Sequence, residues 1–194
     1  MSALNAFVVA DPNKCIGCKV CEVSCAVAHS DLPVKTAGTM TTPIIPRLYL
    51  VKTAEVTMPV QCRQCEDAPC ANACPVGAIT ERDGLIYVNQ EACVGCKTCM
   101  VACPFGAMEM VPHYKAGERV KQLRLTEETG EGPVLQNAFV ASKCDRCVGV
   151  AGGPACVANC PRKALRVVRP EELRRERNLE AALAVLESVK KFIG

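Results

Sequence analysis

The chain has 194 residues, a formal net charge of +3 and 16 cysteines, but it has no Trp, four Phe and three Tyr. A charge this small, without basic patches interleaved with aromatic residues, argues against nucleic-acid binding, and no apolar run approaches the roughly 18 to 20 residues of a membrane span. The N-terminal segment also lacks the basic and apolar regions of a secretory signal, so we expect a cytoplasmic protein whose reduced thiols bind metal instead of forming disulfides.

The chain opens with the apolar run LNAFVV at residues 4–9, which we expect to form a strand leading into a cysteine-rich motif. In this first motif, CIGCKVCEVSC, the ligand candidates are Cys15, Cys18, Cys21 and Cys25, separated by two, two and three residues. A polar, proline-rich stretch follows as far as Pro46. The strand-like run RLYLV at residues 47–51 then precedes the second motif.

The second motif, CRQCEDAPCANACP, has a wider loop. Its cysteines are separated by two, four and three residues, and Pro75 follows the last of them. They are Cys62, Cys65, Cys70 and Cys74. The strand-like run LIYV at residues 85–88 leads into the third motif.

The third motif, CVGCKTCMVACP, is the most diagnostic of the four. Its ligand candidates are Cys93, Cys96, Cys99 and Cys103. This C-x2-C-x2-C-x3-C-P spacing is typical of bacterial ferredoxins, which bind iron–sulfur clusters through cysteine thiolates. Gly95 supplies the backbone freedom that a tight curl around a cluster requires, and Pro104 ends the short helix that carries the last two cysteines. Zinc is the alternative, but structural zinc sites use pairs of cysteines separated by longer stretches.

A polar connection at residues 111–137 follows, and we expect it to be a lid, a hairpin or a partner contact. The strand-like run AFVA at residues 138–141 introduces the fourth motif. Its cysteines, separated by two, eight and three residues and followed by Pro161, are Cys144, Cys147, Cys156 and Cys160. The similar continuations CPVGAI, CPFGAM and CPRKAL mark the last three motifs as internal repeats.

The distances between motifs indicate which of them pair. Only 18 residues separate motifs two and three, whereas 36 and 40 residues separate the other neighbours, so motifs two and three form one pair and motifs one and four the other. Each pair then combines a tight CxGCxxC motif with an expanded loop that contains a proline. In the two-cluster pattern, three cysteines bind one cluster and the fourth binds its partner.

Four ligand sets follow from this crossing, and each is named after the motif that supplies three of its cysteines. The motif-one set is Cys15, Cys18, Cys21 and Cys160, and the motif-four set is Cys144, Cys147, Cys156 and Cys25. The motif-two set is Cys62, Cys65, Cys70 and Cys103, and the motif-three set is Cys93, Cys96, Cys99 and Cys74.

On these motifs the chain resembles the four-cluster electron-transfer subunits of the formate hydrogenlyase type, which are related to the iron–sulfur subunits of the dimethyl sulfoxide reductase family. The resemblance covers about residues 4–168 and is carried by stretches such as CRQCEDAPCANACPVGAI and CVGCKTCMVACPFGAMEM. It implies four [4Fe–4S] clusters, electron transfer without catalytic residues of the chain's own, and a catalytic partner. That partner would be of the formate dehydrogenase, aldehyde oxidoreductase, hydrogenase or carbon monoxide dehydrogenase type.

The expected fold class is α+β, with two ferredoxin-like modules that each hold two clusters. Module A joins residues 1–52 to residues 138–169, and module B comprises residues 53–110. Residues 111–137 are then a connecting insertion, and residues 170–194 form a C-terminal helix.

The C-terminal segment predicts an amphipathic helix. Pro170 and the two glutamates after it suit a helix N-terminus, and a pair of lysines near the end suits its C-terminus. Apolar residues step by three and four along it: Leu179, Ala182, Leu186, Val189 and Ile193. Two alternatives stay open. In the first, the helix covers the modules of its own chain. In the second, residues 171–193 dock on a partner or on another copy of the chain, and repeated head-to-tail contacts between copies would build a filament.

The two histidines, His29 and His113, are expected at the surface or in hydrogen bonds, because cysteines already fill every ligand position. Two other functions stay open, namely a free-standing polyferredoxin and a zinc-stabilised interaction module. Co-purification with a large catalytic subunit argues against the first, and a brown colour that bleaches on reduction excludes the second.

Overall fold

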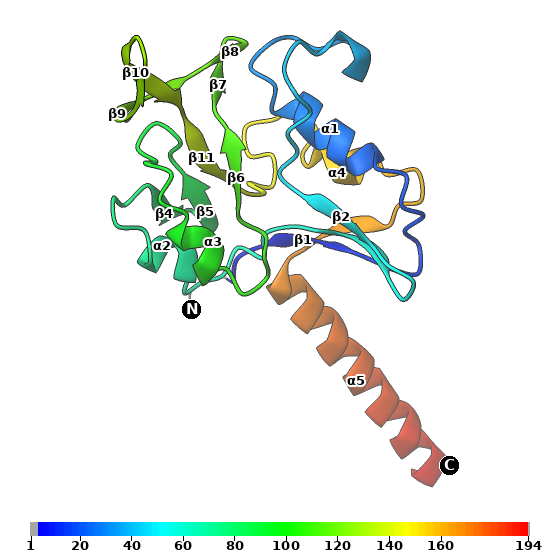
Figure 1. Ribbon diagram of the computed structural model, residues 1–194. Helices are drawn as coiled ribbons and strands as arrows, with labels where there is room; N and C mark the ends of the chain where they lie inside the picture. The colour runs from blue at the N-terminus through cyan, green and yellow to red at the C-terminus, as the bar shows by residue number, and fades with distance from the viewer. Residues whose placement is uncertain (1–3, 194) are drawn as a thin grey trace.

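A computed structural model of the chain describes residues 4–193, with the side chains of residues 123–125 and 193 outside the description. It mixes short helices with short strands around the four cysteine motifs (Figure 1). Module A was expected to begin at residue 1 and the C-terminal helix to end at residue 194. Residues 1–3 and 194 lie outside the described residues.

The elements are short except for the last helix. The helices are α1 (Val20–Ala28), the 3-10 helix η1 (Ala37–Thr39), α2 (Pro69–Asn72), α3 (Thr98–Ala102), α4 (Ala155–Ala158) and α5 (Pro170–Ile193). The first strands are β1 (Phe7–Ala10), β2 (Tyr49–Lys52), β3 (Thr57–Val60), β4 (Ile79–Arg82), β5 (Leu85–Val88) and β6 (Glu109–Pro112). The remaining strands are β7 (Tyr114–Lys115), β8 (Glu118–Arg119), β9 (Lys121–Thr129), β10 (Gly132–Asn137), β11 (Phe139–Ser142) and β12 (Leu165–Val168).

Every sheet of the described residues is a two-stranded antiparallel ladder. Strand β1, before motif one, pairs with β12, after motif four, so that Phe7 lies opposite Val168. Helices α1 and α4, which carry cysteines of those two motifs, also pack against each other. Strand β4 pairs with β5 between motifs two and three, and α2 packs against α3.

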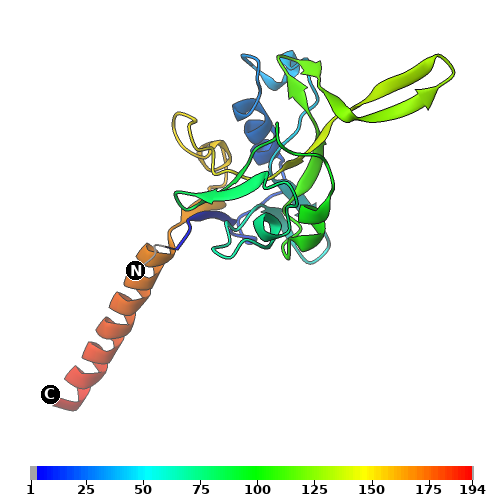
Figure 2. The same cartoon turned by 90° about the vertical axis from the view of Figure 1, so that its left-hand side faces the viewer.

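Two elements project from this body (Figure 2). The insertion at residues 111–137 contains the hairpin of β9 and β10, of which Figure 2 shows the tip extending into solvent. Helix α5 extends in another direction as an isolated rod, and the C-terminus lies at its far end (Figures 1 and 2). The hairpin alternative for the insertion is therefore observed.

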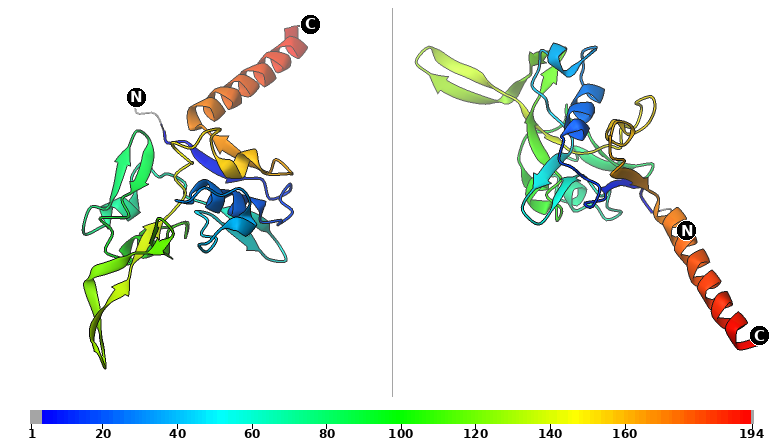
Figure 3. Two further views of the ribbon diagram at one scale, coloured as in Figure 1. Left: turned by 90° about the horizontal axis from the view of Figure 1, so that it is seen from above. Right: turned by 90° about the vertical axis from the view of Figure 1, so that its right-hand side faces the viewer.

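The buried residues form two larger hydrophobic cores. The first consists of Val8, Ala10, Cys21, Cys25, Leu48, Cys156 and Leu165. The second consists of Ala68, Cys70, Ile79, Ile86, Cys99, Met108 and Ala141. Viewed from above, the blue and orange elements of the first core and the green elements of the second lie on opposite sides (Figure 3, left). A small cluster of Cys62, Ala107 and Cys144, which we call the junction cluster, combines cysteines of motifs two and four with an alanine that follows motif three.

The strands expected before the motifs are present, with shifts of up to three residues at their ends. The run at residues 85–88 coincides with β5, while the run at residues 4–9 gives β1. The runs at residues 47–51 and 138–141 give β2 and β11. Strand β11 pairs with β6, which follows motif three, and β2 pairs with β3, so strands near the expected module boundaries pair across them.

Gly95 adopts the left-handed conformation that the tight motif requires, with φ of 72°. A Cβ atom at this position would lie 2.7 Å from the backbone oxygen of Phe139, so the space is closed as well. Gly77 also has a positive φ, 62°, but a Cβ there would meet nothing within 4 Å. Both glycines therefore have a left-handed backbone, but only Gly95 also lacks space for a side chain.

We expect Gly95→Ala to destabilise the protein more than Gly77→Ala. Both variants carry the left-handed penalty of about 1–2 kcal/mol, but only the first also pushes against a backbone carbonyl. Thermal unfolding of the metal-loaded proteins measures the difference, and iron content shows whether the motif-three site survives. Equal melting temperatures would mean that the contact with Phe139 is unimportant.

Candidate metal centres

All sixteen cysteines are free thiols, and the structure gathers them in groups. Cys15, Cys18, Cys21 and Cys160 line one small cavity, together with Pro161 and Ile16. These four are the motif-one set. They come from two segments about 140 residues apart, which the β1–β12 ladder brings together.

The motif-three set is also close in space. Burial raises the pKa of the Cys99 thiol, and the neighbouring thiols of Cys93, Cys96 and Cys74 raise it further. Charges influence each other to this extent only over short distances. Cys74 belongs to motif two in sequence, so the structure brings the fourth cysteine of one motif to the first three of another.

The other two sets show the same crossing. Burial raises the pKa of Cys70 to about 11, and the thiols of Cys62 and Cys103 contribute to the rise. Burial likewise raises the pKa of Cys156, and the thiols of Cys144, Cys25 and Cys147 act in the same direction. Cys103 and Cys25 are the fourth cysteines of motifs three and one, and each lies near three cysteines of the paired motif.

A repeated backbone donor faces the fourth cysteine of three motifs. In each, the alanine four residues later donates its N–H to the thiol sulfur at 3.3 Å, which explains the shared CPxxA continuation. The pairs are Ala78 to Cys74, Ala107 to Cys103, and Ala164 to Cys160. Motif one lacks this proline turn, and Arg47 instead donates its backbone N–H to Cys25 at 3.3 Å. Such donors stabilise a thiolate.

Exposure divides the sets into two kinds. Cys18 and Cys96 are exposed, whereas the cysteines of motifs two and four are buried or half-buried. The junction cluster holds Cys62 and Cys144 together. The motif-one and motif-three sets are therefore called outer sets, and the motif-two and motif-four sets inner sets.

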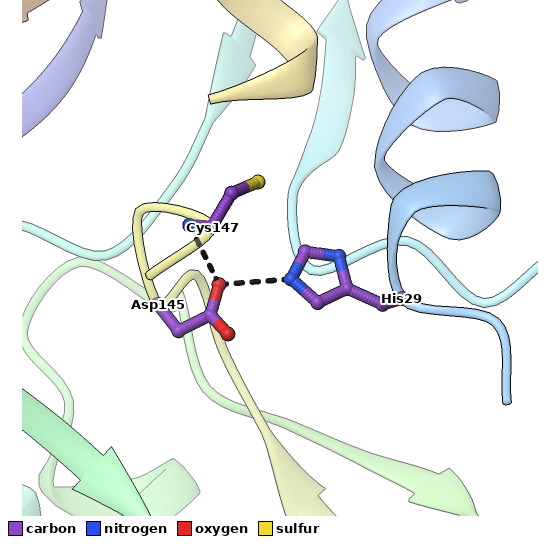
Figure 4. Close-up of side chains that lie close together, drawn as sticks. All are labelled: His29, Asp145 and Cys147. Carbon is purple, nitrogen blue, oxygen red and sulfur yellow. Dashed lines mark hydrogen bonds and ion pairs between the residues drawn. The ribbon is translucent and has the colours of Figure 1, made fainter. Parts of the chain in front are cut away.

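A charged network lies beside the motif-four set (Figure 4). His29, at the end of α1, donates from Nε2 to a carboxylate oxygen of Asp145 at 2.9 Å and from Nδ1 to the backbone oxygen of Cys25 at 2.8 Å. The backbone N–H of Cys147 donates to the same carboxylate oxygen at 2.9 Å, and the guanidinium of Arg47 pairs with the other. His29 thus has the hydrogen-bonding role that the sequence predicts.

The pKa values describe a charged pair. Burial lowers the pKa of His29, but hydrogen bonds to Asp145 and Cys147 outweigh it and raise the pKa to about 12. Burial raises the pKa of Asp145, but the bond from His29 and the charge of Arg47 lower it to about 2. The side chains of His29, Asp145 and Cys147 lie within 4.8 Å of one another, as in a metal site. Because Cys147 belongs to the motif-four set, we interpret the other two as its hydrogen-bonded support.

The donor set fits [4Fe–4S] clusters. Each requires four thiolates, and the sixteen cysteines would suffice for four such sites. Backbone N–H groups directed at sulfur are the outer contacts that stabilise and tune such centres. The described thiols whose pKa burial raises, such as Cys70 and Cys144, would be neutral without a bound cation. Metal binding supplies the positive charge that keeps them deprotonated.

Comparisons with known proteins agree with this chemistry. A family model described as a 4Fe-4S dicluster domain matches residues 53–135, and one described as a 4Fe-4S binding domain matches residues 12–28. Electron transport protein HydN of Escherichia coli is 42% identical over 183 residues, which cover 93% of this chain and 99% of HydN.

Two other relatives have similar coverage. Hydrogenase-4 component A of E. coli is 40% identical over 194 residues, covering 93% of this chain and 91% of that protein. Formate hydrogenlyase subunit 2 of E. coli is 36% identical over 187 residues, covering 89% and 86%. Within residues 4–193, no helix is both long and apolar enough to cross a membrane.

Proposed function

The chain belongs to the family of ferredoxin-type iron–sulfur electron-transfer subunits, and we propose that it relays electrons through four [4Fe–4S] clusters between a catalytic oxidoreductase and a second redox partner. The observation that supports this proposal is that cysteines from different motifs lie close together in the pattern of the proposed ligand sets. The clusters would supply the redox chemistry. The protein's part is to hold them, exclude water and set their potentials.

The four ligand sets defined by sequence are our proposed cluster sites. The proximity of the crossed cysteines supports them, as does the repeated N–H donor to each fourth cysteine. We propose the electron path motif-one set, motif-four set, motif-two set, motif-three set, or the reverse. The exposed Cys18 and Cys96 would lie at its ends, and the junction cluster at its middle.

We further propose two ferredoxin-like modules with the expected boundaries, residues 1–52 with 138–169 and residues 53–110. Two separate hydrophobic cores support this division. The strands near the boundaries, β3 and β11, pair with strands of the neighbouring segment, which would hold the two modules in a fixed relation.

The proposed partner is a catalytic subunit of the formate dehydrogenase, aldehyde oxidoreductase, hydrogenase or carbon monoxide dehydrogenase type. The names of two relatives, a hydrogenase component and a formate hydrogenlyase subunit, support a partner of this kind. We assign no catalytic residue to the chain itself. The free thiols favour a reducing compartment, so we propose a cytoplasmic protein.

Helix α5 is the proposed contact for self-association through residues 171–193. Its larger apolar residues are exposed: Leu179, Leu183, Val185, Leu186, Val189 and Phe192. Figure 1 shows no other described element running along the length of the helix. A helix that docks on a different surface of the next copy makes a heterologous contact, and repeated contacts of this kind produce a filament.

Removal of the residues after Pro170 tests both parts of the proposal. The truncated and full-length chains should both be reduced by dithionite and reoxidised by viologen dyes, because α5 contributes no cysteine. Only the full-length chain should form large assemblies in light scattering or pull down its partner. Turnover of formate, hydrogen or aldehyde by the pure chain would refute the proposal that the chain only transfers electrons and has no active site of its own. Assemblies of unchanged size after truncation would refute the role of α5.

A further inference from the structure

A buried lysine lies where the two inner sets meet. Lys143 is only 4% exposed. None of the ion pairs found among the described residues includes it. Removing an ammonium group from water without an opposite charge is strongly unfavourable. Its position therefore favours a negative charge nearby.

The contacts of Lys143 link motif four to motif two. Its Nζ donates to the backbone oxygen of Cys144 at 3.0 Å and to Oε1 of Gln64 at 3.4 Å. Gln64 lies between two cysteines of motif two and is fully buried. Its Nε2 donates to the same Cys144 oxygen at 2.7 Å, and its Oε1 also accepts the N–H of Ile86 at 3.0 Å. Gln64 thereby fixes the position of the ammonium.

The same place adjoins ligands of both inner sets. Cys144, the residue after Lys143, shares the junction cluster with Cys62 of the motif-two set. Gln64, which accepts from Lys143, also donates its backbone N–H to the sulfur of Cys62 at 3.4 Å. The lysine is therefore within electrostatic range of ligands from both inner sets.

We propose that Lys143 is the counter-charge shared by the two inner clusters and that Gln64 is its positioning residue. The inference rests on the proposed function. A cluster held by four thiolates carries a net negative charge, which becomes more negative by one when an electron arrives. A nearby fixed cation stabilises the reduced form, since net charge helps to set cluster potentials. In the step between the inner sets, one cluster loses an electron and the other gains it, and no proton or bond is transferred.

The test compares the full-length variants Lys143→Met and Lys143→Arg, which differ in charge. Lys97→Met is the matched control, because it removes the same charge from an exposed position beside Cys96 of an outer set. Each protein is prepared anaerobically, its iron is counted, and its midpoint potentials are measured by paramagnetic resonance. At a fixed solution potential, Lys143→Met should lower the ratio of reduced to oxidised inner cluster about tenfold, a shift of about 59 mV for one electron. Lys143→Arg and Lys97→Met should leave the inner potentials unchanged.

Unchanged inner potentials in a Lys143→Met protein with full iron content would overturn the proposal. If that variant loses an inner cluster, the arginine variant decides the matter. Retention of the cluster with Arg supports a need for the cation, whereas loss in both variants indicates packing and overturns the proposal. A wild-type chain without iron would instead refute the proposed function, so the two failures can be distinguished.

Discussion

Cys25→Ser should abolish the same paramagnetic centre as Cys144→Ser, although Cys25 belongs to motif one and Cys144 begins motif four. The reason is the crossing of ligands, in which the fourth cysteine of one motif completes the site of its partner. In the structure, helices α1 and α4 pack together, and the thiols of Cys25 and Cys144 lie close enough to affect each other's charge. We expect complete loss of one signal in each variant.

Cys15→Ser is the control, because Cys15 lies in motif one but belongs to a different set. It should remove an outer centre and leave the centre that Cys25→Ser removes. Reduced proteins are compared by paramagnetic resonance at equal concentration, with iron content measured for each. If Cys15→Ser and Cys25→Ser lose the same signal, the crossed assignment is wrong.

Removal of iron and sulfide should abolish the cooperative fold of the modules. Many of their buried residues are cysteines, and no aromatic side chain belongs to either core. An iron-free interior would thus hold thiols and cavities in place of clusters. Metal binding and folding are coupled in small domains of this kind, so we expect loss of the whole stability and not a partial decrease.

Calorimetry of the chain after treatment with a chelator and an oxidant, followed by reduction, measures this effect. The expected result is disappearance of the cooperative heat absorption, and reconstitution with iron and sulfide should restore it. A sample treated with chelator alone, which retains its iron, is the control. A sharp unfolding transition in iron-free protein would contradict this dependence.

The cysteine motifs could be recognised from the sequence because their spacing alone constrains how thiolates can surround a cluster. The pairing of motif one with motif four stays a prediction, which the β1–β12 ladder supports. The sequence also predicted the limits of helix α5, since Pro170 fixes the start and apolar residues recur at helical intervals. Strands β4, β6 and β12 were not identified, although each follows a CPxxA segment. Charged residues interrupt the apolar character of these three short strands, whose sequences are ITER, EMVP and LRVV, so none of them forms a continuous apolar run. The repeated alanine was the available signal, because its N–H donates to the preceding cysteine.

The support around the clusters could not be predicted in the same way. Gln64 and Lys143 are 79 residues apart, and neither belongs to a recognisable pattern. The same holds for His29 and Asp145, which meet across 116 residues. Such contacts depend on how the two cores pack, and local spacing does not encode that packing. The helix pattern of α5 likewise predicts an apolar stripe but not the surface that the stripe contacts.

Anaerobic analysis of iron, acid-labile sulfide and zinc in the purified chain tests the four-cluster account most directly. Four sites with four cysteine ligands each predict about sixteen iron atoms and about sixteen sulfides per chain. A value near eight of each would contradict the four-cluster claim. Stoichiometric zinc in place of iron would contradict electron transfer altogether.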